Sequence, residues 1–223
     1  MKYIRLIIVI SLFSQTTFGQ ELTGTYTSGN DLIDFSDNKI KFEIISNGGL
    51  VVTLRGQGTY SIVGDFVVIQ TNEFDGIKST VHKECNGHFG LRVVDESSEP
   101  VYAVNVGFYD SKGTVIDGSA TDKSGYIKNK TYKPSETIDV RFIGYDPISF
   151  NYSPDCYFTV TLEEGNTIEN TTVVFKIIEQ TENSVELVLL NTNFKHNSPT
   201  LRQLKKLYRK SKKYNLRERK FEK

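Results

Sequence analysis

Four side chains that commonly bind metal ions lie close together near the middle of the chain: His82, Glu84, Cys85 and His88. Imidazole, thiolate and carboxylate groups are the usual ligands of Zn²⁺ in proteins. A zinc site of this kind normally needs a second paired cluster of ligands or an H-E-x-x-H helix, and the sequence contains neither. We therefore interpret the group as part of a polar linker, and we expect neither a metal ion nor another cofactor.

Residues suited to acid–base catalysis are sparse. The chain contains three histidines, and none of them accompanies a G-x-S-x-G nucleophile motif. No glycine-rich phosphate-binding motif is found. Four aspartates of the central region fall at predicted turns or strand edges, so turn capping and solvation account for Asp95, Asp110, Asp122 and Asp139. These observations predict a protein that is not an enzyme.

The end of the chain carries a strong excess of basic residues. Residues 201–223 contain eleven Lys or Arg and two Glu, whereas the rest of the chain contains sixteen basic and twenty-five acidic residues. The net charge of zero therefore combines an acidic body with a basic tail, and such asymmetry is typical of contact with an anionic partner. The candidate anion-binding residues are Lys205, Lys206, Arg209, Lys210, Lys212 and Lys213.

A helix is predicted within this basic tail. Ser198 suits the N-cap and Pro199 the first helical position, where the missing N–H costs nothing. Apolar residues then recur at helical spacing. We expect the helix to fade near Asn215 and residues 217–223 to be disordered.

Two interpretations of the tail remain open. The helix could dock on the acidic body through Leu201, Leu204 and Leu207 and serve structure alone. Alternatively, its cations could attract an acidic envelope protein, an anionic glycan or lipid head groups. Nucleic acid is not an expected partner, because the first residues of the chain predict export.

Residues 1–20 have the features of a signal peptide. A short basic segment containing Lys2 and Arg5 precedes the apolar run 6–13, and small residues follow it. The run is far shorter than the ~20 residues needed to cross a bilayer, and no later segment is long and apolar enough. We therefore expect an exported protein of the periplasm or cell envelope, with secretion as the alternative, and no transmembrane segment in the mature chain.

Cys85 and Cys156 are the two cysteines of the sequence. Export would place them in an oxidising compartment, where two cysteines commonly pair. A disulfide between them would close a long loop and would contribute about 4 kcal/mol in the loop-entropy estimate. A free reactive thiol or a metal ligand is the alternative.

Residues 21–85 predict a first β-unit followed by a linker. Residues 40–44 alternate strictly between apolar and polar side chains, as a half-buried strand does. The run G-Q-G-T-Y-S-I-V-G-D-F-V-V-I at 56–69 resembles a hairpin of small lipocalin-like envelope domains. The resemblance implies a β-meander or partial barrel.

Residues 86–192 predict a β-sandwich. Short alternating runs are separated by Asp/Gly turns, as in L-R-V-V-D-E-S-S-E-P-V and G-S-A-T-D-K-S-G-Y-I. The order of these pieces resembles the carboxypeptidase regulatory-like domain, which has a transthyretin-like (prealbumin-like) antiparallel sandwich. The resemblance implies a non-catalytic interaction or structural module. It rests on Pro100, Thr121, Asp122, Gly125, Gly144 and Tyr145.

A late hairpin, at 173–178 and 185–190, lies beyond the expected end of that domain. It could extend the sheet of the sandwich, or it could return to the first unit and complete a barrel in which the sandwich is an insertion. Consecutive strands pair about two-thirds of the time, which favours extension. Residues 193–223 then form the helical tail.

The sequence as a whole predicts an all-β protein of the envelope with a C-terminal basic helix. We expect the sandwich to be an interaction or structural module without catalytic activity. The alternative is a lipocalin-like carrier of a small apolar ligand, and a hydrolase with an unrecognised site is a remote third possibility.

Overall fold

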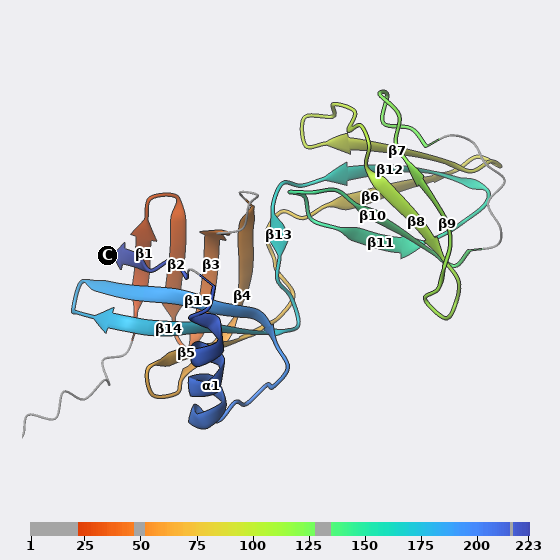
Figure 1. Cartoon of the computed structure of the whole chain (residues 1–223). Coiled ribbons are helices and arrows are strands. Elements are labelled where there is room, and N and C mark those ends of the chain that lie inside the picture. The colour runs from red at the N-terminus through yellow and green to blue at the C-terminus, as the bar shows by residue number, and fades with distance from the viewer. Residues whose placement is uncertain (1–21, 47–51, 128–134, 215) are drawn as a thin grey trace, which may run out of the picture.

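The computed structural model describes residues 22–46, 52–127, 135–214 and 216–223. This part of the chain forms sixteen strands and one helix, so the all-β expectation is confirmed. Figure 1 shows two bodies side by side, a barrel that carries the helix and a smaller pair of sheets. The predicted signal peptide, residues 1–20, lies outside the described residues.

Eight strands form a closed antiparallel barrel. Taken in chain order, each strand pairs with the next one of the series, and β16 returns to pair with β1. Such an up-and-down arrangement removes the free edges of the sheet. The strands are β1 (Gly24–Ser28), β2 (Asp31–Ser36), β3 (Lys39–Ile45), β4 (Thr53–Ile62), β5 (Phe66–Thr71), β14 (Thr172–Gln180), β15 (Ser184–Phe194) and β16 (Arg219–Glu222).

Large apolar side chains fill the interior of the barrel. Strand β3 alternates buried and half-buried positions, as its sequence predicts. The rings of Phe42 and Phe175 lie 6.0 Å apart across the interior, and those of Phe35 and Tyr60 lie 5.0 Å apart. An eight-stranded barrel has an interior just wide enough for side chains to fill. The core of the barrel is therefore a packed one.

The late hairpin belongs to the barrel, so the prediction that it extends the sandwich is wrong. Strand β14 pairs with β5 in register Val173↔Ile69, and β15 pairs with β16. The preference for consecutive pairing holds only within one folded unit. Here the intervening residues bury their own apolar side chains in a separate core, so the barrel resumes after them.

The inserted unit consists of two sheets around one shared core. Leu91, Phe158 and Val160 of one sheet pack with Phe108 and Ile138 of the other. The first sheet has the order β6-β12-β7 and the second β11-β10-β8-β9. The strands are β6 (Thr80–Cys85), β7 (Gly90–Asp95), β8 (Asn105–Tyr109), β9 (Val115–Ala120), β10 (Thr137–Arg141), β11 (Ile148–Asn151) and β12 (Cys156–Leu162).

The smaller sheet is mixed, which differs from the predicted antiparallel sandwich. Strand β12 is antiparallel to β6 but parallel to β7. A parallel pair needs a long crossover, and the chain between β7 and β12 supplies one by passing through the whole second sheet.

Polar contacts fasten the barrel to the inserted unit. The short strand β13 (Asn166–Thr167) pairs with β4, and the Arg55 guanidinium lies 3.4 Å from the Glu163 carboxylate. The buried Ser79 hydroxyl donates to the backbone oxygen of Asp146 and accepts from the amide of Glu163. Both chain crossings between the units thus share one hydrogen-bonded network, which restrains their relative motion.

The pair Lys78–Glu169 makes this junction sensitive to pH. Burial alone would raise the pKa of the Glu169 carboxyl, but hydrogen bonds from the Lys78 ammonium (2.9 Å) and the Phe74 amide (2.6 Å) outweigh burial and lower it. The hydrogen bond to Glu169 also raises the pKa of Lys78. The stability from Glu169 is therefore present above its ordinary pKa of 4.5 and is lost as the pH falls through the lowered value. The stability from Lys78 is lost only as the pH rises beyond 10.5.

We predict that Glu169→Gln lowers the thermal unfolding temperature at neutral pH but not in acid. At low pH the wild-type carboxyl is protonated and resembles the amide, so the two melting curves should converge. Glu73→Gln is the matched control, because Glu73 is largely exposed and lies 3.9 Å from the same ammonium. An equal difference between wild type and Glu169→Gln at every pH would contradict this account.

Candidate functional site

Helix α1 (Leu201–Ser211) has a different N-cap from the predicted one. Thr200, and not Ser198, is the N-cap, and it forms a capping box with Gln203. Pro199 is buried immediately before this cap. The Ser-Pro pair is typical of a helix start. The capping box is favoured instead because its two reciprocal hydrogen bonds satisfy the backbone amides of both Thr200 and Gln203.

The helix docks on the outside of the barrel (Figure 1). Leu204 is fully buried against Phe66, Val174 and Val188, and Leu207 and Tyr208 pack at the margin of the same cluster. The docking part of the structural interpretation is therefore confirmed. Leu201 contributes less, since 37% of it remains exposed.

Basic side chains line the opposite side of α1 and continue through the two residues after it, and we call this group the cationic face. All of them are exposed, and within the described part of the chain none is joined to a carboxylate by an ion pair. Lys212 also lies 4.9 Å from the centre of the Tyr208 ring. The cationic face consists of Arg202, Lys205, Lys206, Arg209, Lys210, Lys212 and Lys213.

One lysine lies beneath the helix rather than on the cationic face. The Lys176 ammonium lies 2.6 Å from the Asp65 carboxylate, and it is placed over the rings of Phe66 and Tyr208. Its charge is therefore neutralised within the fold. The cations of the helix itself are left to face solvent.

Residues 217–223 are ordered, so the prediction of disorder is wrong. They contain β16, in which Arg219 and Phe221 point into the barrel and Lys220 and Glu222 point out. The Arg219 guanidinium lies 2.6 Å from the buried Asp31 carboxylate. This arginine of the basic tail therefore has its anionic partner inside the barrel.

Cys85 and Cys156 form the predicted disulfide. They stand directly opposite each other on β6 and β12, with Cys156 buried and Cys85 exposed. The bond is consistent with an extracytoplasmic protein. It also removes Cys85 from the set of potential metal ligands.

The four residues of the His82 group are not gathered into one cluster of potential ligands. His82 and Glu84 are exposed and lie 3.1 Å apart on β6, and no cluster of three or more potential ligands occurs among the described residues. The expectation that residues 82–88 form a polar linker is only partly met, because β6 runs to Cys85 and belongs to the smaller sheet.

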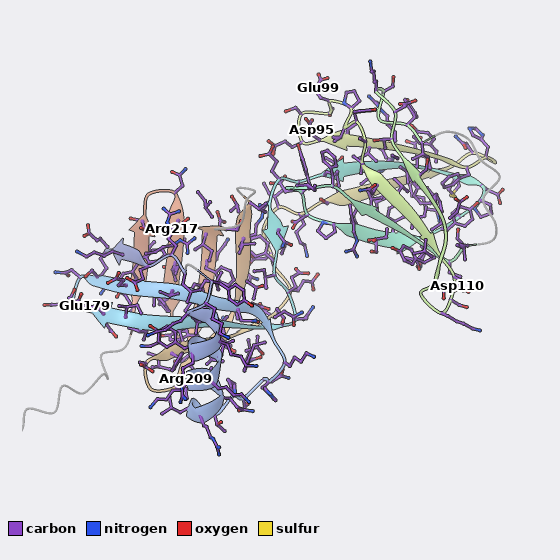
Figure 2. The ribbon with its side chains drawn as sticks, viewed as in Figure 1. Asp95, Glu99, Asp110, Glu179, Arg209 and Arg217 are labelled. Atoms are coloured by element: carbon purple, nitrogen blue, oxygen red, sulfur yellow. A yellow bond between two sulfur atoms is a disulfide. The ribbon has the colours of Figure 1, made fainter. Side chains whose placement is uncertain are left out.

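Three of the predicted aspartates cap turns, as expected. The Asp95, Asp110 and Asp122 carboxylates each accept two backbone amides from their own loops. Figure 2 shows Asp110 at the opposite end of the inserted unit from Asp95. These side chains are therefore occupied by local structure.

Four of the family-motif residues meet in one structural cluster. The buried Thr121 hydroxyl donates to the backbone oxygen of Val101, and Asp122 caps the turn that follows. Gly125 adopts φ +78°, and a Cβ there would lie 2.3 Å from the oxygen of Val93 and close to Pro100. The cluster explains why these residue types occur in the motif.

The other two motif residues, Gly144 and Tyr145, lie at the junction with the barrel. Gly144 accepts a hydrogen bond from the amide of Gly165, and Tyr145 forms a bridge with Glu164. Burial, and then the charge of Glu164, raise the pKa of Tyr145. The motif is therefore split between two structural positions rather than gathered at one site.

Tyr126, Tyr157 and Arg92 form a second cluster on the outer face of the smaller sheet. The Arg92 guanidinium lies 5.6 Å from the centre of the Tyr126 ring. Burial and a hydrogen bond with Tyr126 raise the pKa of Tyr157 to about 12. This phenol is therefore neutral near pH 7 and unsuited to act as a base.

Sequence reasoning missed a polar depression on the outer face of the larger sheet of the inserted unit. Asp139, predicted at a turn or strand edge, stands instead in the middle of β10 and is 6% exposed. Its carboxylate accepts from the Ser149 hydroxyl at 2.8 Å and from Arg141 Nε at 2.5 Å. These contacts raise the pKa of Arg141, first through the hydrogen bond and then through the charge of Asp139. The sequence signal that could have revealed this site is an acidic residue between the apolar Ile138 and Val140 within a predicted strand.

Comparisons with known proteins add no relative. No protein-family model, curated protein or solved structure matches the chain. Within the described residues, no helix has the length and apolar character needed to cross a bilayer.

Proposed function

We propose that this protein is an exported, non-catalytic protein of the cell envelope that binds an anionic membrane surface through the cationic face of α1. The observation that carries the proposal is the docked helix itself. Its apolar side is buried against the outside of the barrel, and seven exposed basic side chains on the helix and the two residues after it have no acidic partner in the described part of the chain. Each cation held near an anionic leaflet contributes about 1 kcal/mol to binding.

Two exposed apolar groups favour a lipid surface over a soluble polyanion. Leu201 begins the helix and is 37% exposed, and Tyr214 follows its end and is 74% exposed. Aromatic and aliphatic side chains beside basic ones are typical of helices that lie in the membrane interface. A soluble acidic polymer would gain little from contact with either residue.

In this proposal the inserted unit is a transthyretin-like module of the carboxypeptidase regulatory type. The support is its two small sheets around one core and the clustering of four of the motif residues. The junction network would hold the module at a set orientation to the barrel, and hence to the membrane-bound helix.

The alternative of an apolar-ligand carrier receives less support. A carrier needs space inside the barrel, whereas Phe42, Phe175 and Phe221 fill it with side chains that are at most 2% exposed. Removal of several of these side chains would be needed to admit a lipid.

The proposal is tested by sedimentation with vesicles that contain phosphatidylglycerol and phosphatidylcholine. Replacing four cations by glutamine should weaken vesicle binding at least about 100-fold, given the contribution of each cation. The variant is Lys205→Gln, Lys206→Gln, Arg209→Gln and Lys210→Gln.

A matched control removes the same net charge elsewhere and should bind as the wild type does. It combines substitutions of exposed lysines on the barrel and the inserted unit: Lys39→Gln, Lys83→Gln, Lys112→Gln and Lys123→Gln. If the control loses as much affinity as the helix variant, net charge rather than the cationic face governs binding. If the protein binds dextran sulfate but not the vesicles, the assignment to a lipid surface is wrong.

A further inference from the structure

The depression around Asp139 has an unusual floor. One row of residues crosses all four strands of the larger sheet in register: Ser149 on β11, Asp139 on β10, Gly107 on β8 and Gly118 on β9. Two adjacent glycines leave the outer face of β8 and β9 without side chains at this row. The surface is therefore hollowed beside a buried acid.

Two adjoining hollows result, of about 410 and 400 Å³. Both are lined by Tyr109, Asp139 and Arg141. The Tyr109 ring lies over Gly107, since a Cβ on that glycine would lie 2.9 Å from Tyr109 Cε2. An aromatic ring thus stands in the middle of a groove that crosses the sheet, near the loop of Asp110 labelled in Figure 2.

Asp139 holds the groove in a defined shape. An outward-facing carboxylate that is only 6% exposed is costly unless its oxygens are satisfied, and here Ser149 and Arg141 satisfy one each. In return, Arg141 is fixed through Nε while its side chain stays 68% exposed. The terminal nitrogens of the guanidinium are left as oriented donors in the groove.

The rim of the groove mixes acceptors and donors. Acidic side chains outnumber Arg141 around it, which disfavours an anionic ligand. The groove also lies on the face of the sheet, where the ladder uses the backbone groups, so a peptide could not add as a strand. Besides the three shared residues, polar lining side chains include Asn105, Asp110, Asp117, Ser119, Glu136 and Thr137.

We infer that this groove binds a neutral saccharide chain. Sugar hydroxyls both donate and accept, so they match carboxylates, hydroxyls and a guanidinium in one site. The Tyr109 ring offers an apolar face to the C–H side of a sugar ring. The open groove suits a few units of a polymer better than an enclosed small molecule. Arg141 and Tyr109 contact the ligand, and Asp139 is a positioning residue.

The inference goes beyond the proposed membrane attachment and uses a separate surface. Figure 2 shows Arg209 of the cationic face on the barrel, far from Asp110 beside the groove. Loss of saccharide binding should therefore leave vesicle binding unchanged, and loss of the cationic face should leave saccharide binding unchanged.

The test is a titration of the full protein with neutral gluco-, manno- and chito-hexasaccharides, followed by two-dimensional amide NMR. At about 10 mM ligand, well above the ~1 mM dissociation constant of a weak site, the amides of Gly107 and Gly118 should shift with at least one probe. Shifts confined to other residues, or none with any probe, would overturn the inference. Binding of unstructured peptides at these amides in place of saccharides would also overturn it.

Two variants sharpen the test. Gly118→Val fills the floor of the groove, and its Cβ would meet nothing closer than the Val106 oxygen at 3.7 Å, so the sheet should tolerate it. Arg141→Ala removes the oriented donors. Each should weaken saccharide binding at least about tenfold, the equivalent of one charged hydrogen bond. Ser61→Val, on an exposed position of β4, is the control and should have no effect. Unchanged affinity in Gly118→Val and Arg141→Ala, with melting temperatures like the wild type, would contradict the site.

Discussion

Replacing Arg219 by alanine should destabilise the barrel by about 3–5 kcal/mol, because it leaves a buried carboxylate without its partner. Arg219 and Asp31 are 5% and 4% exposed, and Arg219 Nε lies 2.6 Å from the Asp31 carboxylate. Asp31 also accepts the amide of Ile45, and Arg219 donates to the oxygen of the same residue. The pair therefore joins β16, the last strand of the barrel, to β2 and β3.

Urea unfolding followed by circular dichroism measures this effect. Lys220→Ala is the matched control. Lys220 is the neighbour of Arg219 on the same strand, but its side chain is exposed, so this substitution should change stability by less than about 0.5 kcal/mol. The double variant Arg219→Ala with Asp31→Asn should recover part of the loss, because it also removes the unpaired charge. Equal stability of Arg219→Ala and Lys220→Ala would contradict the closed barrel described here.

Loss of the disulfide should lower the stability of the inserted unit by about 4 kcal/mol, the loop-entropy value for a closed loop of this length. Cys85 and Cys156 are separated by 71 residues, and the loop between them contains most of the unit. The double variant Cys85→Ala with Cys156→Ala is used because a single substitution would leave the other cysteine as a free thiol.

The barrel provides an internal control for the disulfide. The cysteines lie outside all eight barrel strands, so the barrel transition in the same urea experiment should keep its midpoint. Conversely, Arg219→Ala should move only the barrel transition. A disulfide variant that unfolds at the wild-type midpoint for both units would contradict a stabilising role for the bond.

The sequence was sufficient for features that depend on neighbouring residues. Strict alternation at residues 40–44 identified β3, and Asp-x-x-Gly spacing identified the capped turns at Asp110 and Asp122. The pairing of Cys85 with Cys156 followed from export and a count of two. Each of these inferences requires only local periodicity or composition.

The topology depended on distant residues, so local patterns could not settle it. The R-K-F-E segment at 219–222 does not show a clear alternation of apolar and polar residues, because a charged residue, Arg219, occupies an inward position. That inward arginine is acceptable only where Asp31 of a distant strand faces it. Likewise, nothing within 173–190 tells whether its partner is β12 or β5.

The groove on the larger sheet was hidden for a related reason. Asp139 between two core residues was assigned to solvation, although its burial arises from Ser149 and Arg141 on the same face. The adjacency of Gly107 and Gly118 depends on the register of β8 and β9, which the sequence does not display. Candidate ligand groups therefore became visible only when the strands were aligned.

The most direct test of membrane attachment is the partition of the unmodified protein between buffer and vesicles as the anionic lipid fraction and the salt concentration are varied. The account predicts negligible binding to pure phosphatidylcholine, a steep rise with phosphatidylglycerol, and a marked fall as salt shortens the range of electrostatic attraction to below ~10 Å. Binding that ignores both the anionic fraction and the salt, or no binding at any composition, would contradict the role assigned to the cationic face.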